Sequence, residues 1–127
     1  MGASLYPPPQ APAVTPTVVT SGFTPTSGFT VNNFEARKIN GVCSFGLDLA
    51  VTTTISAGSQ PWNLPDTTIG TLPAGFTPPR TYTATYGTGF ADGEADVTAS
   101  GTITLRSTNS WDISPGNTVR ISGSWVM

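Results

Sequence analysis

The strongest constraint on the fold is a strict alternation of side chains between residues 43 and 55. The odd-numbered positions carry Cys, Phe, Leu, Leu, Val, Thr and Ile, whereas the even-numbered positions carry Ser, Gly, Asp, Ala, Thr and Thr. A period of two residues is typical of a β-strand with one buried and one solvated face. Because the segment is long for a single strand, we expect a bulge or bend near Gly46. We also expect Cys43 to be a buried small side chain rather than a reactive thiol.

A second alternating stretch, residues 94–105, lies on both sides of a turn. A three-residue loop over 99–101 places Val97 opposite Ile103, and both are apolar. A two-residue loop would instead place Val97 opposite the polar Thr104. Because the face pattern sets the register of a hairpin, we predict the three-residue loop, with its final glycine in the left-handed conformation.

The rest of the chain is punctuated by turn residues between short apolar runs. Asn40-Gly41 predicts a tight hairpin turn, and Pro115-Gly116-Asn117 predicts another. Further strands are predicted at Phe34–Asn40, Thr68–Leu72, Arg80–Tyr86, Ser110–Ile113 and Thr118–Val126. Glycine occurs 14 times, and charged residues are only 9% of the chain. We therefore predict an all-β fold, an antiparallel, jelly-roll-like β-sandwich over residues 31–127.

Residues 1–30 have a different composition, because half of the 12 prolines fall between Pro7 and Pro25. The run Pro7-Pro8-Pro9 favours polyproline II, which is extended and has no internal hydrogen bonds. We predict that this segment is an extended arm that binds a partner, not a domain. The residues expected to anchor it are Tyr6, Pro7, Pro8, Pro9, Val14, Val18, Val19, Phe23 and Phe29.

The residue inventory argues against an enzyme. There is no histidine, which removes Ser-His-Asp and Cys-His catalysis and most transition-metal sites. Asp92, Glu94 and Asp96 are the closest set of carboxylates, and a glycosidase-like acid pair or a calcium site are the alternatives for them. Alternation places all three on one strand face, so we expect a solvated surface. We predict no catalytic residue, no cofactor and no bound metal.

The same inventory limits the partners. Only five residues are basic and they are scattered, so we expect no nucleic-acid binding. No apolar run reaches the 18 residues needed to span a bilayer, so we expect no membrane insertion. The N-terminus carries no signal-peptide pattern. We therefore expect synthesis in a cytoplasm, and this argues against a secreted adhesion domain.

The stretch Thr71–Arg80, TLPAGFTPPR, is too rich in proline for a helix or a central strand. We interpret it as a rigid corner that carries the chain from one sheet to the other, and a binding loop is the alternative. Gly75 is expected to take a positive φ, and Phe76 is expected to pack beneath the turn.

The corner and its neighbours resemble a family of small β-domains in bacteriophage virion proteins. TIGTLPAGFTPPR at 68–80 is similar to a "T-I-x-T-L-P-x-G-[FY]-x-P-P" corner found at the ends of tail fibres, in baseplate proteins and in head fibres. Residues 34–43 are similar to the hairpin that opens such domains, and 99–103 and 119–125 match in order. The resemblance covers residues 29–127. It implies a homotrimeric structural protein of the virion, with no catalytic residues.

Two locations in a virion agree with this resemblance. Tail-fibre proteins usually have long shafts, whereas this chain has only a 30-residue arm, which favours a capsid decoration protein or short head fibre. In this hypothesis the arm holds the trimer on the major capsid protein, and the domain stabilises the capsid surface or is displayed on it. The alternative is a tail-fibre or baseplate tip that contacts host surface carbohydrate. We expect the loop residue Trp62 to be displayed and to contact either a neighbouring subunit or a ligand.

Overall fold

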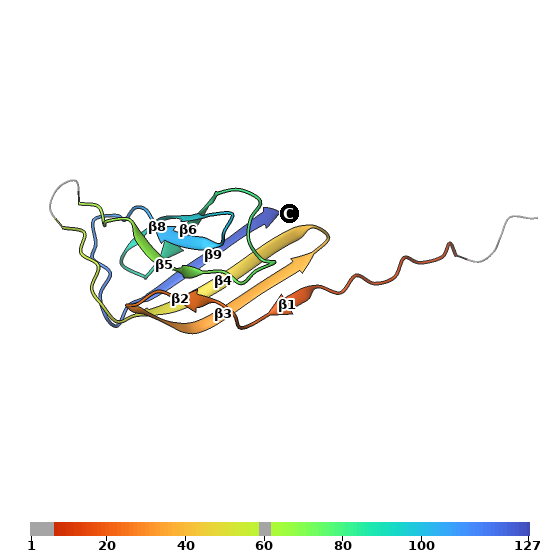
Figure 1. Ribbon diagram of the computed structural model, residues 1–127, viewed down its shortest axis with the longest axis horizontal. Coiled ribbons are helices and arrows are strands. Elements are labelled where there is room, and N and C mark those ends of the chain that lie inside the picture. The colour runs from red at the N-terminus through yellow and green to blue at the C-terminus, as the bar shows by residue number, and fades with distance from the viewer. Residues whose placement is uncertain (1–6, 59–61) are drawn as a thin grey trace, which may run out of the picture.

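The computed structural model describes residues 7–58 and 62–127, and this part of the chain is all β (Figure 1). Its nine strands are β1 (Thr17–Val19), β2 (Thr24–Pro25), β3 (Phe29–Ile39), β4 (Val42–Val51), β5 (Thr67–Thr71), β6 (Tyr82–Gly87), β7 (Asp92–Val97), β8 (Thr102–Leu105) and β9 (Thr118–Val126). Every pairing between them is antiparallel, which confirms the predicted fold class. No helix long and apolar enough to cross a membrane is found among the described residues.

The strands form one continuous sheet in the order β1-β3-β4-β9-β6-β7-β8-β5-β2. The sheet curls until its last strand, β2, lies against β3, so that its two halves face each other as the layers of a sandwich do. The alternating residues of each strand fill the space between the halves. The buried set from β4 and β9 is Cys43, Phe45, Leu47, Leu49, Val51, Val119, Ile121 and Trp125, and it meets Ile69, Ala84, Tyr86, Ala95, Val97, Ile103 and Leu105 from the other half.

Both hairpin predictions are confirmed. Asn40 and Gly41 have φ angles of 50° and 76°, as a two-residue turn with the twist of the flanking strands requires. Val97 pairs with Ile103 across the loop over 99–101, and Gly101 has φ of 87°. In both cases the turn residues and the alternation of the flanking strands specify the same register.

The corner over 71–80 is also built as its residues predict. Gly75 has φ of 85°, and Phe76 is buried beneath the turn while its amide donates to the Pro73 carbonyl at 3.2 Å. The corner joins β5 to β6 across the ends of β8 and β7, within one curled sheet rather than between two separate sheets.

The predicted bulge near Gly46 is wrong, because β4 keeps a regular register and the shift lies in β3 between Val31 and Asn33. The extra residue in β3 changes which positions face inward. Phe29, before the shift, and Phe34, after it, differ by an odd number of residues, yet both are buried. The bulge therefore lets both phenylalanines enter one core.

Two strand predictions also differ from the structure. The strand predicted over residues 43–55 is β4, which begins at Val42 and ends at Val51. No strand forms over 110–113. Only an isolated bridge joins Ile55 to Ile113. These segments belong to long loops, which single backbone hydrogen bonds and side-chain hydrogen bonds hold in place of a continuous ladder.

Residues 17–25, which we call the N-terminal strap, connect the two edges of the sheet. Strand β1 pairs with β3 and strand β2 pairs with β5. Between them Phe23 is buried, with its ring centroid 5.8 Å from that of Phe34. It fills a slot over Gly70, where any side chain would collide with its ring. The chain thus joins the sheet at Thr17, and residues 7–16 extend away from it (Figure 1).

Candidate functional site at the two ends of the domain

The antiparallel order places the connections at two opposite ends. The register joins Ala50 to Thr118 and Leu105 to Thr67. The described parts of the loop between β4 and β5, residues 52–58 and 62–66, therefore gather with the loops 88–91 and 106–117 at one end, the loop end. The hairpin turn at residues 40 and 41 and the start of β1 lie at the other, the arm end. Figure 1 shows the extended segment leaving the domain on the side opposite to these long loops.

The residues predicted to anchor the arm fall into three groups. Pro7, Pro8, Pro9 and Val14 lie on the exposed segment, and Val18 is 42% exposed on β1. Val19, Phe23 and Phe29 pack against the core of their own chain. Tyr6 lies outside the described residues. The exposed segment and Val18 are therefore the parts of the arm that face away from the domain.

The loop end presents aromatic rings to solvent. Trp62, Phe90 and Trp111 are exposed by 49%, 68% and 60% of their surface. Trp62 is displayed, as its loop position predicts. Phe90 and Trp111 were not selected from the sequence. The signal for Phe90 is an aromatic residue inside a short turn, whereas Trp111 was assigned to a strand that does not form.

Side-chain hydrogen bonds tie these loops together. Asn63 donates to the Arg106 carbonyl at 3.2 Å and accepts from the Thr108 amide at 2.8 Å. Asn109 donates to the Phe90 carbonyl at 3.3 Å and accepts from the Asp92 amide at 3.1 Å. The aromatic rings are therefore held on loops that are fixed to one another.

Backbone geometry adds to this rigidity. Ser110 has φ of 76° and Trp62 has φ of 62°, conformations that side chains other than glycine rarely adopt. Such strain needs surrounding structure to hold it, and it is frequent at binding sites. A depression of about 370 Å³ lies beside Ser110. It is lined by Phe90, Ser110, Trp111, Asp112, Ser114 and Asn117.

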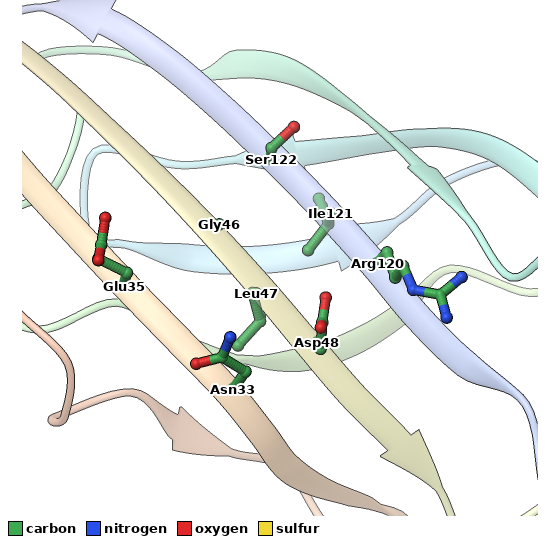
Figure 2. A pocket seen from close by; sticks show the side chains of 8 residues that line it. All are labelled: Asn33, Glu35, Gly46, Leu47, Asp48, Arg120, Ile121 and Ser122. Atoms are coloured by element: carbon green, nitrogen blue, oxygen red, sulfur yellow. The ribbon is translucent and has the colours of Figure 1, made fainter.

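A second depression, of about 400 Å³, lies on the outer face of β3, β4 and β9. Figure 2 shows its polar lining, with Glu35 and Asn33 on one side and Arg120 and Ser122 on the other. It exists because Gly46 has no side chain between Glu35 and Ser122, its register partners. Glu35 forms an ion pair with Arg37 at 2.7 Å. The chemistry that this surface offers is hydrogen bonding in open solvent.

Asp92 and Glu94 are exposed on β7, whereas Asp96 is half-buried. Asp96 lies 3.5 Å from Arg106, which also contacts Asp66 at 2.8 Å, so its partner is a cation rather than a second acid. Residues 7–58 and 62–127 contain no group of three or more potential metal ligands. Cys43 is fully buried, as predicted, and burial raises the pKa of its thiol, although Lys38 lowers it in part.

Comparison with known proteins gives a likeness of fold. No protein-family model matches the chain, and no curated protein matches it either. Among solved structures, the chain is similar to the head domain of the lactococcal phage bIL170, which was described in asking whether the receptor-binding domains of lactococcal phages have a common fold. The match has a TM-score of 0.58 and covers 87% of this chain and 99% of that one, at 18% sequence identity. The two chains thus share a fold.

Proposed function

We propose that this chain is a bacteriophage structural protein on the virion surface, specifically a capsid decoration or head-fibre protein held on the shell by residues 7–16. The observation that carries the proposal is that the two ends of the domain differ. An exposed, extended segment leaves one end, and rigid loops with exposed side chains lie at the other. The fold shared with the bIL170 head domain, which was described with the receptor-binding domains of lactococcal phages, and the sequence resemblance to virion β-domains both support a place in the virion.

The arm is suited to docking in a groove between capsid subunits. The proline-rich segment 7–16 spans about 30 Å when extended. Polyproline II is preformed, so docking costs less conformational entropy than the ordering of a flexible chain. In a homotrimer, three arms would bind neighbouring capsid subunits with avidity. Because the grooves exist only in the assembled shell, binding would stabilise that state by mass action.

Co-sedimentation with capsids that lack this protein tests the proposal. The full-length chain is compared with a truncated chain that begins at Thr17. A cut at Val31 would be uninformative, because it would also remove the buried Phe23 and Phe29. We expect only the full-length protein to sediment with capsids, and both proteins to unfold at the same temperature. Sedimentation of both, or of neither, would overturn capsid anchoring by the arm.

A second candidate function is favoured by the three aromatic residues at the loop end. In this alternative the domain is a tail-fibre or baseplate tip, and Trp62 or Trp111 stacks on sugar rings of the host surface. The bIL170 head domain, described together with receptor-binding domains, supports it. Binding to host cells should then be lost in Trp62→Ala or Trp111→Ala and kept by the chain that begins at Thr17. If the arm instead holds the protein on the shell, both tryptophan variants should still bind capsids, and the chain that begins at Thr17 should not.

A further inference from the structure

A row of apolar side chains crosses the outer face of the sheet at the arm end. Ile39 on β3 lies opposite Val42 on β4, and Val42 lies opposite Val126 on β9. All three point away from the core and are exposed by 37%, 43% and 65% of their surface. Val18, 42% exposed, lies on the neighbouring strand β1 at the border of this row. We call these four residues the arm-end patch.

Further from the arm, the outer face of the same three strands is polar rather than aliphatic. The next row of the outer face holds Arg37, Ser44 and Ser124, and the one after it holds Glu35, Gly46 and Ser122. The outer face therefore changes from aliphatic to polar within one register step. The nearest guanidinium, of Arg37, is paired with Glu35. Exposed apolar side chains that are grouped in this way mark an interaction surface rather than scattered surface residues.

The patch is continuous with the arm. Residues 7–16 enter the domain through β1, whose Val18 lies opposite Arg37 at the border of the patch. Val14, 59% exposed, lies four residues before Val18 on the same extended chain. Any surface that holds the arm up to its junction with β1 is thus brought next to Ile39 and Val42.

We propose that the arm-end patch is a second contact with the same shell protein that binds the arm, and this inference rests on the proposed function. The partner surface would be aliphatic and uncharged, and it would lie beside the groove that accepts residues 7–16. An arm that joins the domain only at β1 would hold the domain without fixing its orientation on the shell. Docking of the patch fixes the orientation, with the loop end directed away from the shell.

Charge substitution in the full-length protein tests the patch. The variant is Val42→Lys with Val126→Lys, and the matched control is Thr85→Lys with Ser122→Lys. Both control residues are exposed on the outer face, pair with each other between β6 and β9, and lie away from the patch. The control therefore adds the same charge on the same sheet. Val42→Ser with Val126→Ser is a milder variant that removes the apolar surface without adding charge.

Capsid affinity is measured by quantitative co-sedimentation, and oligomeric state by light scattering. We expect the lysine variant to bind at least about tenfold more weakly than wild type, because a charge would be buried in an apolar contact. The serine variant should lose less, and the control should bind as wild type does. The thermal unfolding midpoints should agree among all four proteins, because the substituted side chains are exposed.

Three results would overturn the inference. Unchanged capsid binding by the lysine and serine variants would refute the patch and leave arm anchoring intact. A change of oligomeric state with unchanged capsid affinity would assign the patch to contacts between copies of this chain. Failure of the wild-type protein itself to bind capsids would refute the proposed function, and this inference with it.

Discussion

The two ends of the domain expose different kinds of apolar side chain. In the described part of the chain, the large exposed apolar residues at the arm end are Val14, Val18, Ile39, Val42, Val126 and Met127, whereas those at the loop end are Trp62, Phe90 and Trp111. The arm end holds the hairpin turn at Asn40 and Gly41, straight strand ends and the rigid corner over residues 71–80. The loop end is made of long loops joined by asparagine side chains.

This difference indicates different kinds of contact. Aliphatic side chains in register form a surface that suits a dry contact with another protein. Aromatic rings beside amides and hydroxyls can combine stacking with hydrogen bonds, so they suit a more polar partner. The arm end is thus built to hold the molecule, and the loop end is built to present a surface. The predictions below separate the two ends, and the largest expected effect comes first.

The first prediction compares how much the N-terminal strap and the residues before it contribute to stability. Phe23→Ala should reduce the free energy of unfolding by about 3–5 kcal/mol, because a buried ring and its contact with Phe34 are lost. Removal of residues 1–16 should change it by less than about 0.5 kcal/mol. Urea denaturation measures both. A small effect of Phe23→Ala would show that the strap does not close the sheet in solution.

The second prediction concerns the rigidity of the loop end. Asn109→Ala removes hydrogen bonds to the Phe90 carbonyl and the Asp92 amide. We expect a loss of about 1–3 kcal/mol and faster hydrogen exchange in residues 88–91 and 106–117. The exposed Asn33 on β3 is the control, and Asn33→Ala should change stability by less than about 0.5 kcal/mol. Equal exchange in both variants would mean that Asn109 does not hold the loops together.

The third prediction uses one titrating group at each end. Cys43 lies near the arm end, and burial raises the pKa of its thiol above 9.0. Tyr86 donates its hydroxyl to the Ser107 carbonyl at the loop end. Burial, with the Asp92 carboxylate, raises its pKa above 10.0, although a hydrogen bond with Thr108 lowers it in part. The folded protein then retains protons that the unfolded chain releases. Both contributions to stability are complete below pH 9 and are lost as the pH rises through the folded values.

Variants assign this loss to the two ends. In Cys43→Ala the decline of the unfolding midpoint should begin nearer pH 10 than pH 9. In Tyr86→Phe the decline of the midpoint above pH 10 should be smaller than in wild type. Thermal unfolding from pH 7 to pH 11 measures this. A midpoint that rises between pH 9 and pH 10 would contradict the direction of the Cys43 shift, and one that rises above pH 10 would contradict that of Tyr86.

The smallest effect on stability is expected from the exposed tryptophans. Trp62→Ala and Trp111→Ala should each change the free energy of unfolding by less than about 0.5 kcal/mol. Acrylamide should quench the fluorescence of Trp62 and Trp111 but not that of Trp125, which is 3% exposed. A double Trp62→Phe, Trp111→Phe protein should therefore retain a single, protected emission. Strong quenching of that protein would show that the core around Trp125 is open to solvent.

The two hairpins and the corner could be predicted from the sequence alone. The alternation around Cys43 and the turn at Asn40-Gly41 specified a hairpin, and the pattern around residues 99–101 specified the register of another. Gly75 and Phe76 shaped the corner. These features follow from side chains and turn chemistry within a few residues of one another, so a short window of sequence contains them.

Only the tertiary structure decided where the chain closes and what each end exposes. The placement of Phe23 depends on Gly70, and that of Asn109 depends on Asp92, partners that no local pattern relates. The bulge in β3 follows from the need to bury Phe29 and Phe34 in one core. The aliphatic row at the arm end requires three strands in register. Each of these features is set by packing between distant segments, and its free energy exists only once the sheet has curled.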